Sequence, residues 1–533
     1  METKELPPPS LEGVDSLTMP SRVQSRITQR REVWLFAAAV VFCSGACSPD
    51  RSPTSSLEPP PVTLTIGVPT AIGQDPLYGV TQASRLVSFE GLSGQNLSGR
   101  PVPRLAERWA EASDGMAWTI WLRRSAVFHD GSPVDAKAVK QSLETFLKTG
   151  SGRFPLGLHD VASIEIADTH TLIIRLKQRS TLLLDNLDTP ITKLDANGLQ
   201  IGTGPYVVTS TSPDQVLMSA FPQYYRAQPT IKRLAWKLYP TVRTAWAATM
   251  RGEVDFLYEV GPESREFLEF ERSVELYSFL RNYVYGLVFN SNRPFFRDQK
   301  VRTALNYAVD RHAIIERAFR GHATIAHGPA WPLHWAHNSD APVFLYDPAR
   351  AVASLRGAAA KGATRETLVG LKFACLIPQN FQLWERLALM VQRDLAEIGV
   401  EMVLESVPFD EFNQRVATGT FDAILTEMIS GFSASRPFYF WHSSASANYF
   451  GYRNDAVDAA FDGMKSAANE SEYRRAYSRF QQATFEDPPA IFLAWGQTAR
   501  AVSRRFDVVR SDFGDIRTTI AQWNLAEPAR APN

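Results

Sequence analysis

The residues most suggestive of acid–base chemistry are His129 and Asp130, in the segment AVFHDGSP. Proton transfer could use such a pair, but nucleophilic catalysis also needs a nucleophile at a defined offset, and none stands near these two residues. Asp130–Gly131 has turn composition, so we expect the pair to shape a turn. The sequence also lacks a GxSxG elbow, an HExxH helix and a Walker loop. We therefore predict a protein that is not an enzyme and needs no cofactor.

Metal-ligating residue types are too scattered to predict a metal site. The three cysteines are Cys43, Cys47 and Cys375, and no Cys/His cluster has ligand spacing. Two of them stand in or at the end of an N-terminal apolar run, which leaves Cys375 alone in the body of the chain and excludes a disulfide scaffold. His442 is a lone histidine, which is more often structural than a ligand. We predict no metal.

The length and the charge of the chain limit the classes of protein to which it can belong. A chain of 533 residues is too long for one core, so at least two domains are expected. Lys+Arg and Asp+Glu are both 56, and this balance gives no basic excess that would indicate nucleic acid. The supply of 12 Trp, 16 Tyr and 31 Phe suits aromatic cores and also an aromatic-lined cleft.

The N-terminus predicts export. Residues 1–33 are polar and arginine-containing, and the apolar run WLFAAAVVFCSGAC that follows is too short to span a bilayer comfortably. It looks like a lipoprotein signal in which Cys47 becomes the lipidated first residue, although Ser44 stands where an aliphatic residue is usual. An uncleaved anchor is the alternative, and Met19 could be the true start. Residues 48–61 are rich in Pro and Ser and predict a disordered tether.

The body of the chain changes character along its length. Up to about residue 199 it predicts β hairpins, with turns at Asp114–Gly115 and at 168–170. From residue 371, strands at 371–377, 400–406 and 421–425 alternate with helices at 383–398 and 409–418. Such alternation predicts an α/β layer. Further helices are predicted at 454–465 and 471–486, and a strand at 491–495.

An amphipathic helix is predicted between these two regions. Its apolar residues recur at i, i+3, i+4, i+7 and i+8 from Val301 to Val309, which makes one apolar face. Asp298 can cap this helix, and Asp310 can cap a second short helix that carries an Ile pair.

Several segments in order resemble the family 5 extracellular solute-binding proteins, the peptide, dipeptide and nickel receptors of bacterial ABC importers. The segments are LAERWAEASDGMAWTIWLRRSAVFHDGSPVDAKAVKQSLE at 105–144, IGTGPYV at 201–207, GEVD at 252–255, FNSNRPFFRDQKVRTALNYAVDRHAII at 289–315 and YDP at 346–348. One match would be weak, but the ordered set covers most of residues 62–525.

The resemblance implies an α/β, two-lobed periplasmic-binding-protein fold (Venus-flytrap) with an extra β-rich subdomain in the first lobe. The expected parts are a signal segment at 1–47, a tether at 48–61, lobe I at 62–284 with its subdomain at about 91–199, lobe II at 285–494, and a return to lobe I at 495–533. The expected interlobe crossings are Tyr283–Phe289 and Leu493–Trp495.

The resemblance also indicates where a solute would bind. Dipeptide receptors carry a Gly-Trp-x-Ala-Asp-Tyr-Pro-like stretch whose Asp holds the peptide's amino terminus, and the matching stretch here is GFSASRP at 431–437. Phe432 can still stack, Ser435 replaces the Asp, and Arg436 adds a fork that suits a carboxylate or phosphate, unless it is simply solvated. We therefore expect solutes to present an acidic or neutral group here. The remaining cleft candidates are Gln379, Asn380, Tyr283, Tyr285 and Trp441.

The function implied by the resemblance is a monomeric receptor, outside the cytoplasm and anchored to the membrane by lipid at its N-terminus. It would close on a peptide-like or anionic organic solute and deliver it to an ABC permease served by a separate ATPase. The alternative is an exported two-lobe sensor or chaperone that is not coupled to transport. No nucleic-acid partner is expected.

Overall fold

The computed structural model describes residues 62–69, 83–149, 156–359, 371–512 and 514–527, so the signal segment, Cys47 and the tether lie outside the described residues. Residues 60–533 form one compact unit. Within the described ranges, no helix combines the length and the apolar character that a membrane crossing would require.

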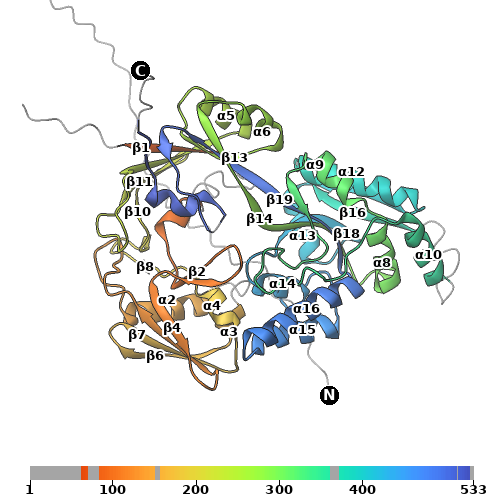
Figure 1. The fold of residues 1–533 in the computed structure, drawn as a ribbon, viewed down its shortest axis with the longest axis horizontal. Helices are drawn as coiled ribbons and strands as arrows, with labels where there is room; N and C mark the ends of the chain where they lie inside the picture. The colour runs from red at the N-terminus through yellow and green to blue at the C-terminus, as the bar shows by residue number, and fades with distance from the viewer. Residues whose placement is uncertain (1–61, 70–82, 150–155, 360–370, 513, 528–533) are drawn as a thin grey trace, which may run out of the picture. The chain divides into compact units, whose positions relative to one another are not determined.

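One mixed sheet runs through this unit (Figure 1), with 11 strands among the described residues. Its strands are, in spatial order, β10 (Tyr206–Ser212), β11 (Gln215–Ala220), β12 (Arg233–Tyr239), β1 (Thr63–Pro69), β13 (Phe256–Val260), β19 (Ala490–Ser503), β14 (Val274–Phe289), β18 (Ala423–Ile429), β16 (Lys372–Pro378) and β17 (Glu401–Val407), with β15 (Ala323–Ile325) added to β19.

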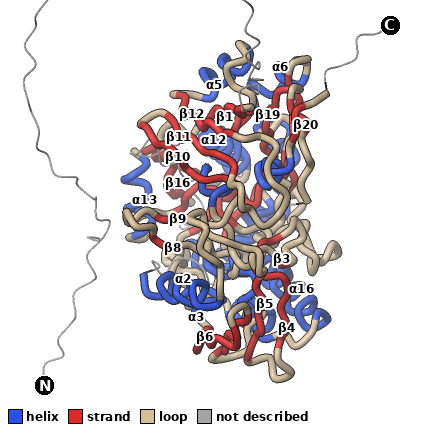
Figure 2. The backbone as a smooth tube through the Cα atoms, turned by 90° about the vertical axis from the view of Figure 1, so that its left-hand side faces the viewer, coloured by secondary structure: helices blue, strands red, loops and turns tan. Residues whose placement is uncertain are grey.

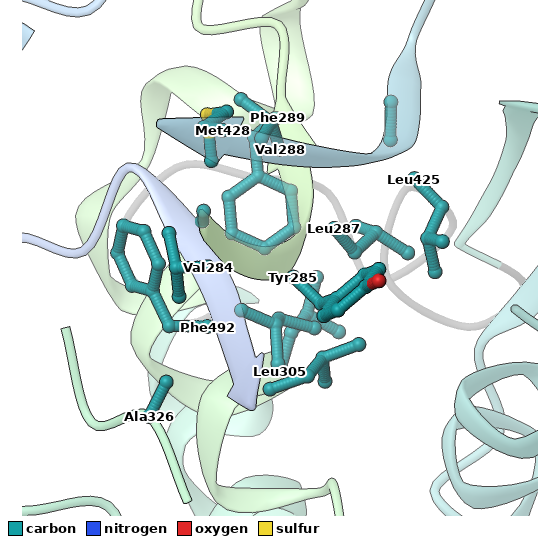
Figure 3. Packing of buried hydrophobic residues seen from close by; sticks show 14 of the residues in the cluster. Val284, Tyr285, Leu287, Val288, Phe289, Leu305, Ala326, Leu425, Met428 and Phe492 are labelled. Carbon is teal, nitrogen blue, oxygen red and sulfur yellow. The ribbon is translucent and has the colours of Figure 1, made fainter. Parts of the chain in front are cut away.

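Distinct hydrophobic cores lie along this sheet, and they define the two lobes named below. The core of lobe II runs from Val284 to Trp495, and Figure 3 shows Phe289, Leu305 and Phe492 within it. Lobe I is built around a cluster that includes Trp236 and Trp523, together with the separate core of its β-rich subdomain. The exact lobe boundaries given above remain predictions.

The β-rich subdomain is a four-stranded antiparallel sheet covered by helices. Its order is β4 (Ala106–Glu111), β5 (Ala117–Leu122), β7 (Thr171–Leu176) and β6 (Val161–Asp168). Figure 2 shows β4, β5 and β6 together with α2 (Ala136–Thr149) and α3 (Leu156–His159). Both predicted hairpins are confirmed, and Gly115 takes the positive φ of 70° that the β4–β5 turn requires.

The remaining elements complete the two lobes. Lobe I also contains a helix at 83–88, α4 (Leu182–Asn186), α5 (Val242–Met250), α6 (Pro262–Glu269), the 3-10 helix η1 (Ile516–Gln522), and the short strand pairs β2 (Ser93–Gln95) with β3 (Pro101–Pro103), β8 (Lys193–Leu194) with β9 (Gln200–Ile201), and β20 (Phe506–Asp507) with β21 (Asn524–Leu525). Lobe II also contains α7 (Pro294–Arg297), α8 (Gln299–Tyr307), α9 (Arg311–Ala318), α10 (Pro348–Ala359), α12 (Gln382–Glu397), α13 (Phe409–Ala417), α14 (Ser435–Trp441), α15 (Asp455–Ser466) and α16 (Glu470–Glu486).

The predicted α/β alternation is confirmed, because β16 pairs in parallel with both β17 and β18. The capped helices are confirmed as well. Asp298 accepts a hydrogen bond from the Lys300 amide at 2.8 Å, and Asp310 accepts one from the Ala313 amide at 3.0 Å.

The two long strands β14 and β19 pass between the lobes side by side. They pair regularly up to Leu280 opposite Gln497, and then the register shifts before Val284 meets Trp495. Three residues of β14, Arg281 to Tyr283, therefore stand opposite a single residue of β19, Gly496. A bulge of this kind bends a strand and redirects its side chains. The strand predicted at 491–495 is too short, since β19 continues to Ser503.

Candidate functional site

The site is built around the loop that joins β18 to α14, because this loop packs on the bulge of β14. The amides of Ser430 and Gly431 both donate to the carbonyl of Asn282, at 3.0 and 2.9 Å. A Cβ on Gly431 would lie 2.6 Å from the Asn282 Cβ, so only glycine allows this approach. Phe432 follows at a positive φ of 70°, and its ring packs edge-on against Trp331 at 5.5 Å.

Lobe I reaches the same loop through residues 96–100. The Trp331 indole donates to the Leu97 carbonyl at 2.8 Å, and the Trp335 amide donates to the Ser98 carbonyl at 2.9 Å. Gly99, at a φ of 76°, approaches so closely that a Cβ there would lie 2.0 Å from the Phe432 carbonyl oxygen. The two lobes are thus in backbone contact at Phe432.

Two carboxylates of lobe I also face this loop. Ser433 donates a short hydrogen bond to Asp185 of α4, and its hydroxyl lies 2.8 Å from that of Ser435. Burial raises the pKa of Asp185 to about 7, although the Ser433 hydrogen bond opposes the rise. Arg436 lies 3.7 Å from Asp188, and burial raises the pKa of Asp188 as well. Arg436 is therefore partly buried and faces a carboxylate, so it is not the isolated cation from which an anionic solute was expected.

The bulge contributes a charged pair that joins β14 to β18. Arg281 donates to both oxygens of Glu427, at 3.0 and 3.2 Å, and to the hydroxyl of Tyr285 at 3.3 Å. The same guanidinium lies over the ring of Tyr283, 4.9 Å from its centre. Such a bidentate, stacked arginine is held in one orientation.

Tyr283 is where groups of both lobes meet. Burial raises the pKa of its hydroxyl, and Glu427 and Tyr258 act in the same direction, whereas Arg281 and Arg436 lower it. Tyr258 belongs to β13 of lobe I and accepts a short hydrogen bond from Arg517. Half-buried Tyr283 therefore lies against Arg281 and within the electrostatic influence of groups from both lobes.

Of the other predicted cleft residues, Tyr285 meets the site only through its hydroxyl, which accepts from Arg281, and Trp441, Gln379 and Asn380 lie elsewhere. Trp441 is wholly buried in the lobe II core, stacked on Phe450 at 5.6 Å, and Tyr285 is buried against Phe319. Tyr285 lies on a buried part of β14 and Trp441 on a buried part of α14, so both side chains belong to the hydrophobic core. Gln379 and Asn380 are exposed after β16, and no described contact joins them to Tyr283 or Arg436.

His129 and Asp130 shape a turn, as the sequence predicts. The His129 ring contacts the Gly204 carbonyl at 3.0 Å, and Asp130 pairs with Lys193 at 2.6 Å. His442 lies 3.9 Å from Asp458 and 3.7 Å from Asp462. In the part of the chain that the structure describes, no group of three or more His, Cys, Asp or Glu side chains could hold a metal ion.

Sequence reasoning missed Asp185, Asp188, Arg281 and Tyr258. Asp185 and Ser433 are 248 residues apart, so no local pattern connects them. Arg281 could have been found, since it is a charged residue directly before an alternating apolar strand at a predicted crossing. Glu427, the partner of Arg281, lies within β18, where no local pattern marks it.

The chain has two lobes with separate cores, and β14 and β19 join them. Polar side chains of both lobes meet near these strands, which is the arrangement of a two-lobed binding protein. Residues 100–450 match the profile of the family described as bacterial extracellular solute-binding proteins, family 5 Middle, and the chain belongs to this family.

Known relatives agree with this assignment. The chain is 25% identical to the oligopeptide-binding protein AppA of Bacillus subtilis over 527 residues, which cover 91% of this chain and 96% of the relative. It is 27% identical to the glutathione-binding protein GsiB of Salmonella choleraesuis over 456 residues, covering 80% and 86%. The structure of NikZ from Campylobacter jejuni in complex with Ni(L-His) matches with a TM-score of 0.74 and 24% identity, covering 86% of this chain and 99% of NikZ.

Proposed function

We propose that this solute-binding protein delivers a peptide-like or other small organic solute to an ABC permease powered by a separate ATPase. The observation that carries the proposal is the meeting of both lobes at the loop that joins β18 to α14, where Ser433 donates to Asp185 and Arg436 lies 3.7 Å from Asp188. The names of its relatives, an oligopeptide-binding and a glutathione-binding protein, support a peptide-like solute.

The mechanism would be closure of the lobes about β14 and β19. These strands carry the backbone across, and the bulge at 281–283 is where their pairing is interrupted. A bound solute favours the closed state only by the difference in its affinity for the two states, about 5.5 kcal/mol for a change from 1:99 to 99:1. Side chains from both lobes provide such a difference, because they can contact one solute together only when the lobes are close.

Mass spectrometry of small molecules retained by the purified protein tests the proposal. We expect a retained compound of peptide-like or related polar character, and small-angle scattering should show that this compound compacts the solute-free protein. A retained compound that leaves the radius of gyration of an open, solute-free form unchanged would argue against closure.

We also propose that Cys47 carries lipid and anchors the protein outside the cytoplasm, where members of its family act. The support is the charged segment, the apolar run and the small residues before Cys47. Cys47→Ser should release the protein from the membrane fraction or leave it as an unprocessed precursor. An intact N-terminal segment on the wild-type protein, with no lipid on Cys47, would establish a simple anchor instead.

A further inference from the structure

A further contact between the lobes is made at the C-terminal end of α15. The last four carbonyls of an α-helix have no partner within the helix. Here lobe I supplies partners, because Thr181 donates its amide to the Lys465 carbonyl at 2.8 Å and its hydroxyl to the Met464 carbonyl at 2.9 Å. The segment of lobe I between β7 and α4 therefore caps a helix of lobe II.

Arg179 adds a charge to this cap. Its guanidinium donates to the carbonyls of Ala467 at 3.1 Å and Ala468 at 3.4 Å, directly after α15, where a cation also faces the negative end of the helix dipole. Lobe I orients this guanidinium, since Glu111 pairs with it at 2.9 Å and a Cβ on Gly115 would lie 2.7 Å from it. The Arg179 side chain is therefore positioned by its own lobe and bonded to the other.

An ion pair beside the cap runs from lobe II to lobe I. Lys465, in the last turn of α15, lies 2.9 Å from Asp160, and the two side chains are only 19% and 7% exposed. Gln178 also donates to Asp160 at 2.9 Å, so lobe I orients this carboxylate as well. Because both charges are largely buried, removing one of them leaves the other uncompensated while the lobes are in contact.

These contacts do not depend on the candidate solute site. They join residues 160 and 179–181 to residues 464–468, whereas the candidate site is formed by the loop at 431–437 and the bulge at 281–283. The same groups can bond to water when the lobes separate, so the contacts can form and break reversibly. They can therefore favour contact between the lobes before a solute is present.

We propose that Asp160, Arg179 and Thr181 of lobe I form a latch with the end of α15 in lobe II, and that this latch closes part of the solute-free population. The inference rests on the proposed closure of the lobes and adds to it, because it assigns part of the closing free energy to protein contacts alone. The apparent affinity for a solute increases with the fraction of molecules in the binding-competent state, so the latch also strengthens binding.

Hydrogen exchange of two amides tests the latch, because each amide donates to a carbonyl of the opposite lobe. The Thr181 amide reports on the latch, and the Trp335 amide, which donates to Ser98 at 2.9 Å, reports on a separate contact between the lobes. Dialysis in denaturant followed by refolding removes retained solute, and mass spectrometry resolves exchange to single residues. Both amides should be protected in the solute-free wild-type protein.

Arg179→Ala should make both amides exchange roughly threefold faster or more, since losing a charged hydrogen bond changes the ratio of closed to open molecules by about tenfold or more. Lys465→Ala removes the ion pair from the other lobe and should act in the same direction. Arg175→Ala is the matched control, because Arg175 is an exposed arginine of the same subdomain whose partner, Glu165, also belongs to lobe I. The control should exchange as the wild type does, and circular dichroism checks that each variant is folded.

The latch is overturned if either amide of the solute-free wild-type protein exchanges as fast as in an unfolded chain. It is also overturned if the Trp335 amide keeps its wild-type rate in a folded Arg179→Ala or Lys465→Ala protein, because the cap would then act only locally. Solute should compact Arg179→Ala more than the wild type, since fewer molecules of the variant start closed. Compaction of both proteins by an equal amount would overturn the latch and leave the receptor function standing.

Discussion

At the scale of single residues, the buried carboxyl of Asp185 makes a specific prediction about pH. Its pKa is about 7 in the folded protein and near 3.8 in the unfolded chain, so the folded state binds the proton more tightly. The contribution of Asp185 to the free energy of unfolding is therefore greatest below its pKa in the unfolded chain. This contribution falls as the pH rises toward 7, by at most about 1.4 kcal/mol per pH unit.

Asp185→Asn should remove this loss, because an amide stays neutral and can still accept from Ser433. The difference in melting temperature, variant minus wild type, should increase from pH 5 to pH 8. Asp507→Asn, an exposed acid on β20, serves as the control and should give only a small difference. A difference for Asp185→Asn that stays constant over this range would contradict the raised pKa.

The residues of the site show how far sequence reasoning reaches. It identified the loop that carries Phe432, Ser435 and Arg436, because a contiguous stretch resembles the family pattern. It could not identify Asp185 and Asp188 as the partners of that loop, because only folding brings α4 beside α14. The expectation about charge at Arg436 left Asp188 out for this reason, and the charge of the solute stays a prediction.

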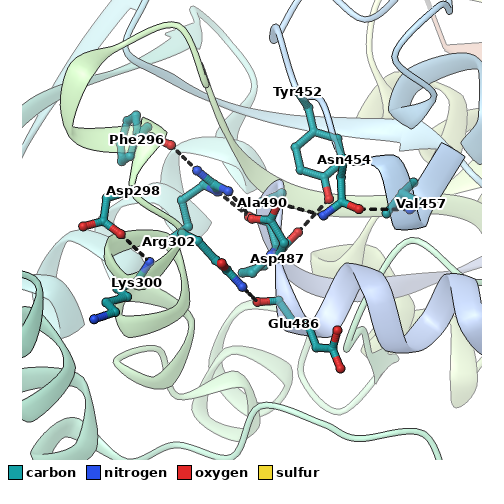
Figure 4. Close-up of polar contacts among 12 residues, drawn as sticks. Phe296, Asp298, Lys300, Arg302, Tyr452, Asn454, Val457, Glu486, Asp487 and Ala490 are labelled. Atoms are coloured by element: carbon teal, nitrogen blue, oxygen red, sulfur yellow. Dashed lines mark hydrogen bonds and ion pairs between the residues drawn. The ribbon is translucent and has the colours of Figure 1, made fainter.

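At the scale of elements, α8 is tied to the segment between α16 and β19 by one buried arginine. Arg302 pairs with Asp487 and donates to the carbonyls of Pro488, at 3.0 Å, and Phe296 (Figure 4). Asp487 also accepts from Asn454 at 2.8 Å, which joins the cap of α15 to the same carboxylate. Helix α8, the cap of α15 and the end of α16 therefore share one charged contact.

Asp487→Ala should lower the free energy of unfolding by about 3 kcal/mol, since it leaves the buried guanidinium of Arg302 without a counter-charge. Asp298→Ala removes only the exposed N-cap of the same helix and should cost about 1 kcal/mol. Denaturant unfolding of the two variants measures both losses. Equal losses would mean that the buried pair contributes no more than a helix cap.

Helices and hairpins were predictable because their signals are local. The caps at Asp298 and Asp310 and the turn at Asp114–Gly115 each depend on a few neighbouring residues. The length of β19 was not predictable, because residues past Trp495 become strand by pairing with β14 and β13, more than 200 residues earlier in the chain.

At the scale of the whole molecule, Gly99 controls how closely the lobes can approach. A Cβ at this position would lie 2.0 Å from the Phe432 carbonyl oxygen, a backbone atom of the other lobe that cannot turn aside as a side chain would. An alanine Cβ at position 99 would clash with Phe432 only while the two lobes are in contact, as they are in this structure. Gly99→Ala should therefore disfavour the closed state.

Gly198 provides a matched control for the backbone effect. Its φ of 78° is close to the 76° of Gly99, but a Cβ at Gly198 would meet nothing within 4 Å. Alanine at either position carries a similar left-handed strain, about 1–2 kcal/mol, so the difference between the two variants isolates the clash between the lobes.

Small-angle scattering and calorimetry then measure the consequence for binding. With the retained solute present, Gly99→Ala should show a larger radius of gyration than Gly198→Ala, and its affinity should fall because the binding-competent state is less populated. The two variants should have the same secondary structure by circular dichroism. If Gly99→Ala compacts and binds as Gly198→Ala does, then the contact at Phe432 yields locally, and closure of the lobes does not depend on it.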